Sequence, residues 1–266
     1  MPVIRPAAVA GTFYPSDPAE LTRDIDALLS RAPRARVGAK AVVAPHAGYI
    51  YSGPVAASAF AALGDLSGVT RIIVVGPAHR VRLRGLAGPG ADALATPLGE
   101  LPVDRDALAQ AHIPDAVDVH RDEHALEVEL PFLRRLAPHA HIVPIAVGLA
   151  DPDEVAAALD ALWGGPETRI VVSSDLSHYL PYAEGRAIDE QTAQAVLALR
   201  DDALDGHRAC GHVALAGLLR VARRRGLTPE VLDLRSSGDT SGRRSEVVGY
   251  GAFAFHEPRG DRHGSR

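Results

Sequence analysis

Three histidines and one cysteine are the residues of this chain best suited to chemistry. His46, His79 and His178 each follow a short apolar run typical of a buried strand, and Cys210 precedes an apolar helical run. Imidazole and thiolate groups bind iron, copper and zinc, and three such ligands leave positions open for substrate or dioxygen. If the strands are parallel neighbours, the imidazoles converge at their C-terminal ends, where ligands bind in open α/β sheets.

Each of these residues also has a simpler interpretation. A single loop histidine usually makes ordinary hydrogen bonds, and a lone cysteine is often only a small buried apolar residue. All three histidines lie just past the end of a predicted strand, and this shared position favours a common crevice. At a helix N-terminus we expect the thiol pKa to fall, which would make Cys210 a better ligand or nucleophile. His207 and His212 flank Cys210 and are alternative ligands.

Other polar residues are candidates for the rim of this crevice. Asp175 stands three residues before His178, so it either orients that imidazole or caps the following turn. An unperturbed histidine has a pKa of about 6.5, so His178 could move a proton at neutral pH. Tyr49 and Tyr51 are close to His46 in sequence and either border the pocket or pack in the core. We therefore assign Asp175 and His178 to catalysis and both tyrosines to the substrate pocket.

The segment Asp122-Glu123-His124 is predicted to open a helix over residues 123–136. Glu127 lies one turn past His124, and a His-x-x-Glu pair can bind metal in helical bundles that carry two copies of it. Because this chain has one copy, we interpret the pair as a helix-start cap with a surface or outer-sphere role. His124 is included among the residues of the substrate pocket.

Alternating strands and helices predict the scaffold that positions these residues. The expected buried strands are Ala41–Ala44, Arg71–Val75, His141–Val147 and Arg169–Val172, and helices are expected between them. Capping signals at Asp17 and Asp151, each followed by proline and then glutamate, open two further helical segments. The pattern predicts a single α/β domain with a mostly parallel central sheet and helices on both faces. Two C-terminal segments, Val231–Arg235 and Glu246–Phe255, are expected to pair antiparallel and make the sheet mixed.

Composition limits the class of protein. The 266 residues carry a net charge of −5, are 47% apolar and include one cysteine. No basic stripe suggests nucleic acid, and the arginines of residues 80–84 are interpreted as solvated surface. No run approaches the ~18 apolar residues of a membrane span, and the chain starts without a signal-like apolar segment. We expect a cytoplasmic protein with one domain over residues 1–256 and a disordered tail over 257–266.

Seven short motifs together resemble the Memo family, also called system protein B of the AmmeMemoRadiSam group. They occur in the family's order between about residues 5 and 255, and their combination is highly specific. The motifs are Arg5-Pro6-Ala7-Ala8-Val9-Ala10-Gly11-Thr12-Phe13-Tyr14-Pro15, Ala44-Pro45-His46-Ala47-Gly48-Tyr49, Gly76-Pro77-Ala78-His79, Asp122-Glu123-His124-Ala125-Leu126-Glu127, Ser173-Ser174-Asp175-Leu176-Ser177-His178, Ala209-Cys210-Gly211 and Val248-Gly249-Tyr250-Gly251-Ala252-Phe253. One departure is local: His212-Val213-Ala214 stands where relatives often have a proline-containing turn.

The resemblance implies a fold similar to that of class III extradiol dioxygenases, the non-haem-iron ring-cleaving enzymes. It implies His46, His79 and Cys210 as ligands of iron(II) or copper, with cysteine in place of the enzymes' carboxylate, and His178 in the acid–base position. It also implies a functional link to an AMME-type protein and a radical SAM protein.

Three functions follow from these expectations. The first is iron- or copper-dependent redox chemistry on an unknown small molecule, although an oxidisable thiolate argues against catechol cleavage itself. The second is a non-enzymatic protein that binds metal or a peptide in the same pocket. The third is a zinc hydrolase, which the ligand set allows but which lacks a His-Glu-x-x-His motif. Metal identity separates the first function from the third.

Overall fold

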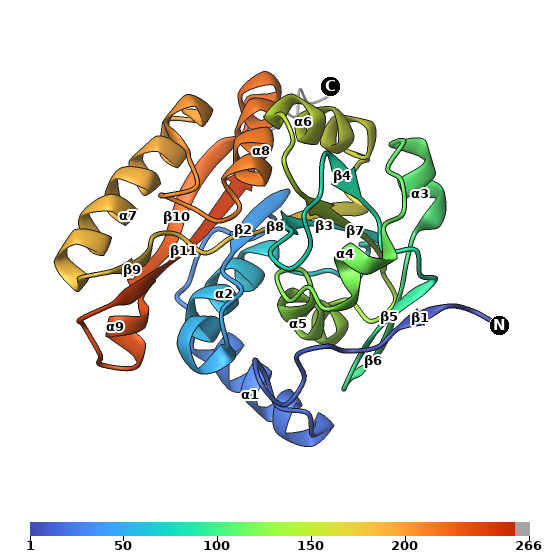
Figure 1. Cartoon of the computed structure of the whole chain (residues 1–266), viewed down its shortest axis with the longest axis horizontal. Helices are drawn as coiled ribbons and strands as arrows, with labels where there is room; N and C mark the ends of the chain where they lie inside the picture. The colour runs from blue at the N-terminus through green and yellow to red at the C-terminus, as the bar shows by residue number, and fades with distance from the viewer. Residues whose placement is uncertain (259–266) are drawn as a thin grey trace, which may run out of the picture.

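A mixed sheet lies at the centre of the computed structural model, which describes residues 1–258 (Figure 1). Its strands are β2 (Ala41–Ala44), β3 (Arg71–Pro77), β4 (Leu86–Ala87), β7 (His141–Val147), β8 (Thr168–Ser173), β9 (His178–Leu180), β10 (Thr228–Ser236) and β11 (Val247–His256). Their order is β10-β11-β2-β8-β3-β7-β4, and β9 pairs with β11. Strands β2, β8, β3 and β7 are parallel, whereas β11 runs antiparallel to β2 and β10. The predicted mixed, mostly parallel sheet and the C-terminal antiparallel pair are confirmed.

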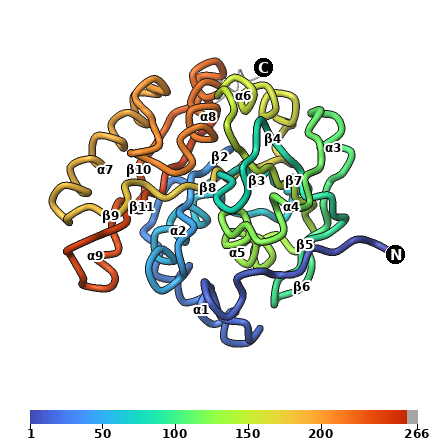
Figure 2. Tube along the Cα trace, viewed as in Figure 1, coloured from blue at the N-terminus to red at the C-terminus, as the bar shows by residue number. Residues whose placement is uncertain are grey.

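Helices cover both faces of this sheet, as Figures 1 and 2 show. One side carries α1 (Pro18–Arg31), α2 (Tyr49–Leu63) and α5 (Leu130–Leu136), and the other carries α6 (Pro152–Ala161), α7 (Tyr182–Leu197) and α8 (His212–Arg225). Helix α2 packs on β2, β10 and β11, while α8 packs on β3 and β8. The central strands are therefore covered on both faces, which explains their continuous apolar sequences.

A smaller sheet and several short elements complete the fold. The small sheet consists of β1 (Ile4–Arg5), β5 (Ala93–Thr96) and β6 (Gly99–Pro102), in the order β1-β5-β6. The short helices are α3 (Arg105–Gln110), α4 (Val117–Arg121), η1 (Glu127–Glu129), η2 (Asp201–Ala203) and α9 (Ser237–Thr240). These elements carry too few residues to show a clear hydrophobic period, and apart from η1, which lies within the helix expected over residues 123–136, the sequence did not predict them.

The helix starts show where local signals were sufficient. Asp17 caps α1 by accepting a hydrogen bond from the Glu20 amide, and Asp151 and Glu154 form a capping box on α6. The continuous helix predicted over residues 123–136 is wrong. Residues 123–126 form a turn that leads into η1 and then α5. The reason is that the Glu123 side chain accepts the amides of the two residues that follow it.

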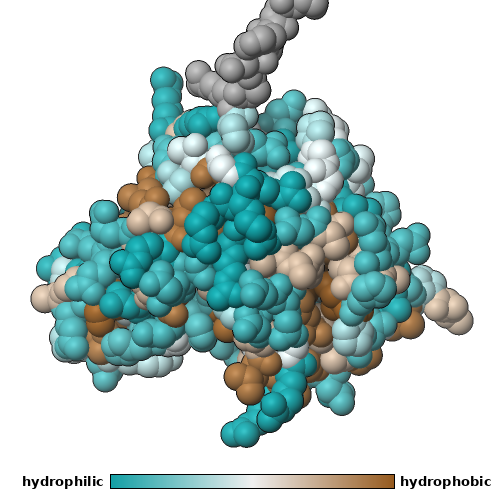
Figure 3. Space-filling model, turned by 90° about the horizontal axis from the view of Figure 1, so that it is seen from above, coloured by the Kyte–Doolittle hydropathy of each residue, from teal (hydrophilic) through white to brown (hydrophobic). Residues whose placement is uncertain are grey.

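Strands β2, β3 and β8 form the centre of the apolar core, and their Val and Ile side chains are buried. Figure 3 shows the face at the top of Figure 1, where hydrophilic side chains dominate and apolar ones form small separate patches. In the described part of the chain, no helix is long and apolar enough to cross a bilayer. The predicted tail, residues 257–266, lies outside the described residues from position 259 onward.

Candidate metal centre

Two of the predicted histidines and the cysteine converge at one edge of the sheet. His46 and His79 each follow by two residues the C-terminal end of a parallel strand, β2 and β3, and β8 lies between these strands. Cys210 reaches the same edge from the segment that leads into α8. One ligand atom from each of the three residues lies within 4.8 Å of the others. The expectation that the strands are parallel neighbours is confirmed.

The hydrogen bonds of His46 decide which ring nitrogen faces the cluster. Ser173 Oγ lies 2.6 Å from the Ala125 carbonyl oxygen, which can only accept, so the hydroxyl donates to it. His46 Nδ1, 2.7 Å from the same Oγ, must then carry the hydrogen and donate. This leaves Nε2 without a proton, 3.4 Å from Cys210 Sγ. A bare Nε2 is the form of imidazole that binds a metal.

The protonation state of His46 supports the same role. Burial holds the pKa of His46 well below its ordinary value, and the neighbouring His79 and His124 lower it further. The imidazole is therefore neutral at physiological pH, as a metal ligand must be. Glu129, on the far side of Ser173, is fully buried, and burial raises its pKa well above the ordinary value. A neutral Glu129 can donate to Ser173 Oγ, which completes the hydrogen bonding of that hydroxyl.

His79 is held by Glu123, a residue that the sequence analysis named only as part of a helix start. Glu123 Oε1 lies 3.1 Å from His79 Nδ1, and its carboxylate also accepts the amides of His79, Arg80, His124 and Ala125. Burial alone would raise the pKa of Glu123, but hydrogen bonds from the His124 and His79 rings and from these amides hold it well below its ordinary value. A carboxylate on the outer nitrogen of a histidine is a common device for orienting metal ligands. It leaves His79 Nε2 free.

His124 adds a third imidazole to the cluster. Its ring centroid lies 4.9 Å from that of His79 and 5.5 Å from that of His46. His79, Glu123 and His124 also have ligand spacing. However, the Glu123 oxygens already accept several N–H groups, whereas the set of His46, His79 and Cys210 keeps unshared donor atoms. The latter set is the better candidate.

Cys210 differs from the expectation in one respect. Its thiol pKa is not lowered: burial raises the pKa of Cys210 to about 12, and the nearby Asp175 acts in the same direction. The expected lowering is wrong because α8 begins only at His212, and the desolvation of the thiol outweighs any effect of the helix start. A bound cation would supply the positive charge that a thiolate needs there. Two imidazoles and one thiol form a donor set that fits iron, copper or zinc.

A cavity of about 830 Å³ opens beside this cluster. Its walls include most of the predicted pocket residues: His46, His79, His124, Asp175, His178, Tyr51 and Cys210. Tyr250, which sequence analysis placed only within a motif, lines the same cavity. A volume of this size is typical of sites for small ligands.

Asp175 and His178 both face this cavity, but Asp175 holds a different partner from the one expected. Its Oδ1 accepts the His46 amide at 2.8 Å, so it fixes the loop of His46 and not the His178 ring. Burial raises the pKa of Asp175 to about 7, although the amides of His46 and Ala47 oppose this shift. His178 begins β9, and burial lowers its pKa even though the Leu176 carbonyl favours the protonated ring.

Tyr49 lies away from the cavity, contrary to its assignment to the substrate pocket. Its side chain is buried, and its hydroxyl donates to the Val128 carbonyl at 2.9 Å. Its ring packs between Tyr14 and Phe132, with centroid distances of 5.6 and 5.0 Å. Helix α2 begins at Tyr49, which directs this side chain into the core and leaves Tyr51 at the cavity.

Glu127 organises the N-terminal segment and does not approach the metal cluster. Its carboxylate accepts hydrogen bonds from the Arg5 guanidinium, the Tyr14 hydroxyl and the amides of Ala8 and Val9. The cap role expected for it is wrong, because all of these donors come from a segment more than a hundred residues away in sequence. His207 and His212, the alternative ligands, are absent from the clusters with ligand spacing among residues 1–258.

Comparison with known proteins shows the family of this chain. A family model described as "Memo-like protein" matches residues 5–254. A MEMO1 family protein of Aquifex aeolicus is 33% identical over 268 residues, which cover 95% of this chain and 99% of that protein. MEMO1 family proteins of Archaeoglobus fulgidus and Methanosarcina barkeri are each 33% identical, over 95% and 94% of this chain and 99% of their own length. The chain therefore belongs to the Memo family.

Proposed function

We propose that this protein carries iron(II) or copper on His46, His79 and Cys210 and performs redox chemistry on a small molecule. The observation that supports the proposal most strongly is the convergence of the three donor atoms within 4.8 Å. Ser173 and Glu123 hold the outer nitrogens of the two imidazoles, so the inner nitrogens are already presented. A binding site needs ligands that are held in place before the metal arrives, whereas the packing of the core does not require this arrangement.

Each residue around the cavity has a distinct task in this proposal. A bound iron or copper ion would supply Lewis acidity and one-electron redox chemistry. His178, whose pKa is lowered by burial, is a neutral imidazole that can accept a proton from a substrate in the cavity. Asp175, with a pKa of about 7, can hold or release a proton near neutral pH while it keeps the His46 loop in place.

Metal content tests the first half of the proposal. The protein, its Cys210→Ala variant and a His139→Ala control would be purified without oxygen, and bound metal would be measured by mass spectrometry. His139 is exposed and lies outside the ligand clusters, so it controls for the loss of a surface histidine. We expect close to one iron or copper ion per chain in the wild type and control, and a large loss in Cys210→Ala.

The other outcomes are equally informative. Stoichiometric zinc in place of iron and copper would contradict redox chemistry and favour a hydrolytic or structural site. If neither protein holds metal after reconstitution, the metal centre is wrong, and the cavity is better explained as a binding pocket for a small molecule or peptide.

Turnover tests the second half of the proposal, the redox chemistry on a small molecule. Oxygen uptake by the metal-loaded wild type would be measured against a panel of small organic substrates and compared with His178→Gln. We expect His178→Gln to keep its metal and lose most of the uptake, because only proton transfer is removed. Equal uptake by the two proteins would exclude His178 from catalysis. Metal binding without uptake on any substrate would favour a non-enzymatic role.

A further inference from the structure

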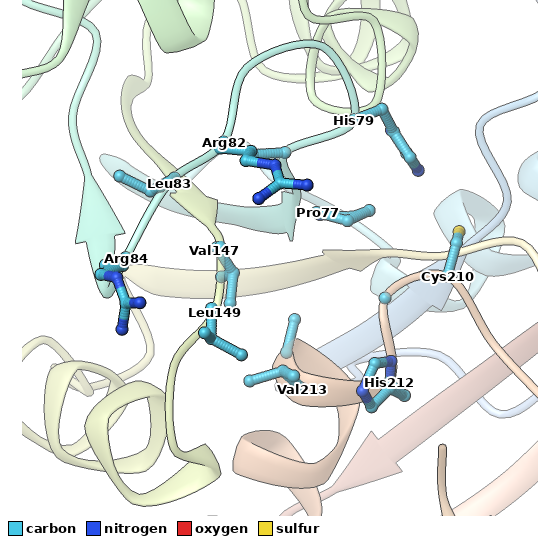
Figure 4. A pocket seen from close by; sticks show the side chains of 14 residues that line it. Pro77, His79, Arg82, Leu83, Arg84, Val147, Leu149, Cys210, His212 and Val213 are labelled. Carbon is cyan, nitrogen blue, oxygen red and sulfur yellow. The ribbon is translucent and has the colours of Figure 1, made fainter. Parts of the chain in front are cut away.

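A second cavity, here called the groove, meets the candidate metal centre from the side of α8. It has a volume of about 620 Å³ and shares His79 and Cys210 with the first cavity. Figure 4 shows these two residues at one end of the groove and Arg84 and Leu149 at the other. A molecule lying in the groove would therefore end against the proposed metal ligands.

The floor of the groove is apolar. Pro77, Val147, Leu149 and Val213 line it, contributed by β3, β7, the segment after β7 and α8. Leu149 is 71% exposed, which places it among the most exposed large apolar side chains of residues 1–258. An exposed apolar surface inside a concave site is typical of a binding pocket and not of ordinary solvated surface.

The wall of the groove carries cationic groups without partners. Arg82 and Arg84 line it, and Figure 4 shows the Arg82 guanidinium directed into the cavity. Among residues 1–258, neither arginine has a carboxylate within salt-bridge distance or a side-chain hydrogen bond. The arginines of α8 differ, because Arg220 and Arg223 pair with Asp201 at 2.7 Å. Arg82 and Arg84 are exposed, as expected from sequence, and they also line the groove.

We propose that the groove binds an organic anion with an apolar body. Its anionic group pairs with the Arg82 guanidinium, aided by Arg84, and its body lies on Val147, Leu149 and Val213. Guanidinium groups bind carboxylates, phosphates and other oxyanions through paired hydrogen bonds, and the apolar floor favours anions that also carry an apolar body. Binding does not depend on metal. The additional step, that such an anion is the substrate class, rests on the proposed function.

Binding can be tested with a matched pair of probes. 1-Anilinonaphthalene-8-sulfonate is an apolar organic anion, and N-phenyl-1-naphthylamine has the same aromatic body without the charge. Each would be titrated by fluorescence into the full-length, chelator-treated protein and into variants whose folding is verified by circular dichroism. We expect Arg82→Ala to weaken binding of the anion about tenfold and to change binding of the neutral probe little. Arg84→Ala should act in the same direction with a smaller effect.

Two further variants complete the design. Leu149→Asn should weaken the binding of both probes, because it alters the apolar floor on which both would lie. The double variant Arg34→Ala/Arg36→Ala removes two exposed arginines outside the groove and should leave both affinities unchanged. The proposal is overturned if wild-type protein does not bind the anion, if Arg82→Ala binds it as well as wild type, or if Arg82→Ala weakens both probes equally.

Thiol labelling tests whether the ligand reaches the metal ligands. Cys210 is the only cysteine, so labelling by neutral 4,4′-dithiodipyridine reports on one site. Bound anion should slow labelling several-fold in wild type and not in Arg82→Ala at the same probe concentration. An unchanged rate with saturating anion would place the ligand away from Cys210 and remove the link to the metal centre. Because the protein is metal-free throughout, failure of the metal proposal would leave these results unaffected.

Discussion

Strand β2 carries a buried polar residue near each of its ends, and the two are treated differently. Lys40 precedes the strand, and its ammonium lies 2.7, 2.8 and 3.0 Å from the carbonyl oxygens of Trp163, Gly165 and Thr168. His46 follows the strand and has one ring nitrogen bonded to Ser173, while the other faces a cavity. Both are 2% exposed.

The difference separates a structural polar group from a functional one. All three hydrogens of the Lys40 ammonium have acceptors, and the group also lies 5.1 Å from the centre of the Trp163 ring, so nothing further can bind to it. At His46 the protein holds the ring but leaves its inner nitrogen available. Burial alone therefore does not identify a site; burial with an unshared atom directed at a cavity does.

The largest expected effect is on metal affinity at the His46 end. We expect His46→Ala to weaken iron or copper binding more than about 100-fold, since even outer-sphere partners of a ligand are worth 10- to 100-fold. Stability should change by only about 1 kcal/mol, because the imidazole borders a cavity. Equilibrium titration with metal and urea unfolding measure the two effects. Severe unfolding of His46→Ala would show that this end, too, is structural.

Lys40→Met should show the opposite pattern. It removes the ammonium that donates to three carbonyl groups, and we expect a loss of about 3 kcal/mol in the free energy of unfolding. Metal affinity of the folded fraction should equal that of wild type. Urea unfolding provides the first measurement and metal titration below the transition provides the second. A variant as stable as wild type would contradict the structural role assigned to Lys40.

Two buried carboxylates of one segment sharpen the same contrast. Glu123→Gln places an amide N–H₂ group among N–H donors and disturbs the outer nitrogen of His79, so metal affinity should fall about 10- to 100-fold. Glu127→Gln is the matched control, because Glu127 holds only the N-terminal segment. It should lower the unfolding temperature without weakening metal binding. Equal losses of affinity in both variants would indicate a general effect of folding.

The smallest expected effect is the pH dependence of metal loading. In the metal-free protein the pKa of Cys210 is about 12, so the thiol is protonated, whereas His46 is already neutral. Loading must then release the thiol proton, and apparent affinity should rise about tenfold per pH unit between neutral pH and the pKa of the thiol. Cys210→Ala should lose this slope. A flat profile in wild type would mean that the thiol is not a ligand.

Local sequence was sufficient for the elements with a strong pattern. The expected strands Ala41–Ala44 and His141–Val147 have those bounds in the structure, because a strand covered on both faces must be apolar throughout. The caps at Asp17 and Asp151 were equally readable, since they act within one helical turn. The convergence of His46 and His79 followed from topology alone, because parallel strands of one sheet end at the same edge, and only β8 lies between β2 and β3.

Tertiary structure decided what depends on contacts between distant segments. The motif Asp122-Glu123-His124 suggested a helix start, yet Glu123 binds His79 and Glu127 binds the segment around Tyr14. Tyr49 and Tyr51 could not be told apart by sequence, because only the start of α2 directs one ring into the core and the other to the cavity.

The state of Cys210 was likewise beyond local reasoning. A helix N-terminus in sequence suggested a lowered thiol pKa, but burial beside Asp175 raises it. Sequence by itself determined the family, the parallel core and the residue types at its edge, because these depend on neighbours along the chain. The structure alone decided protonation, hydrogen-bond partners and access to the groove, since each depends on residues brought together by folding.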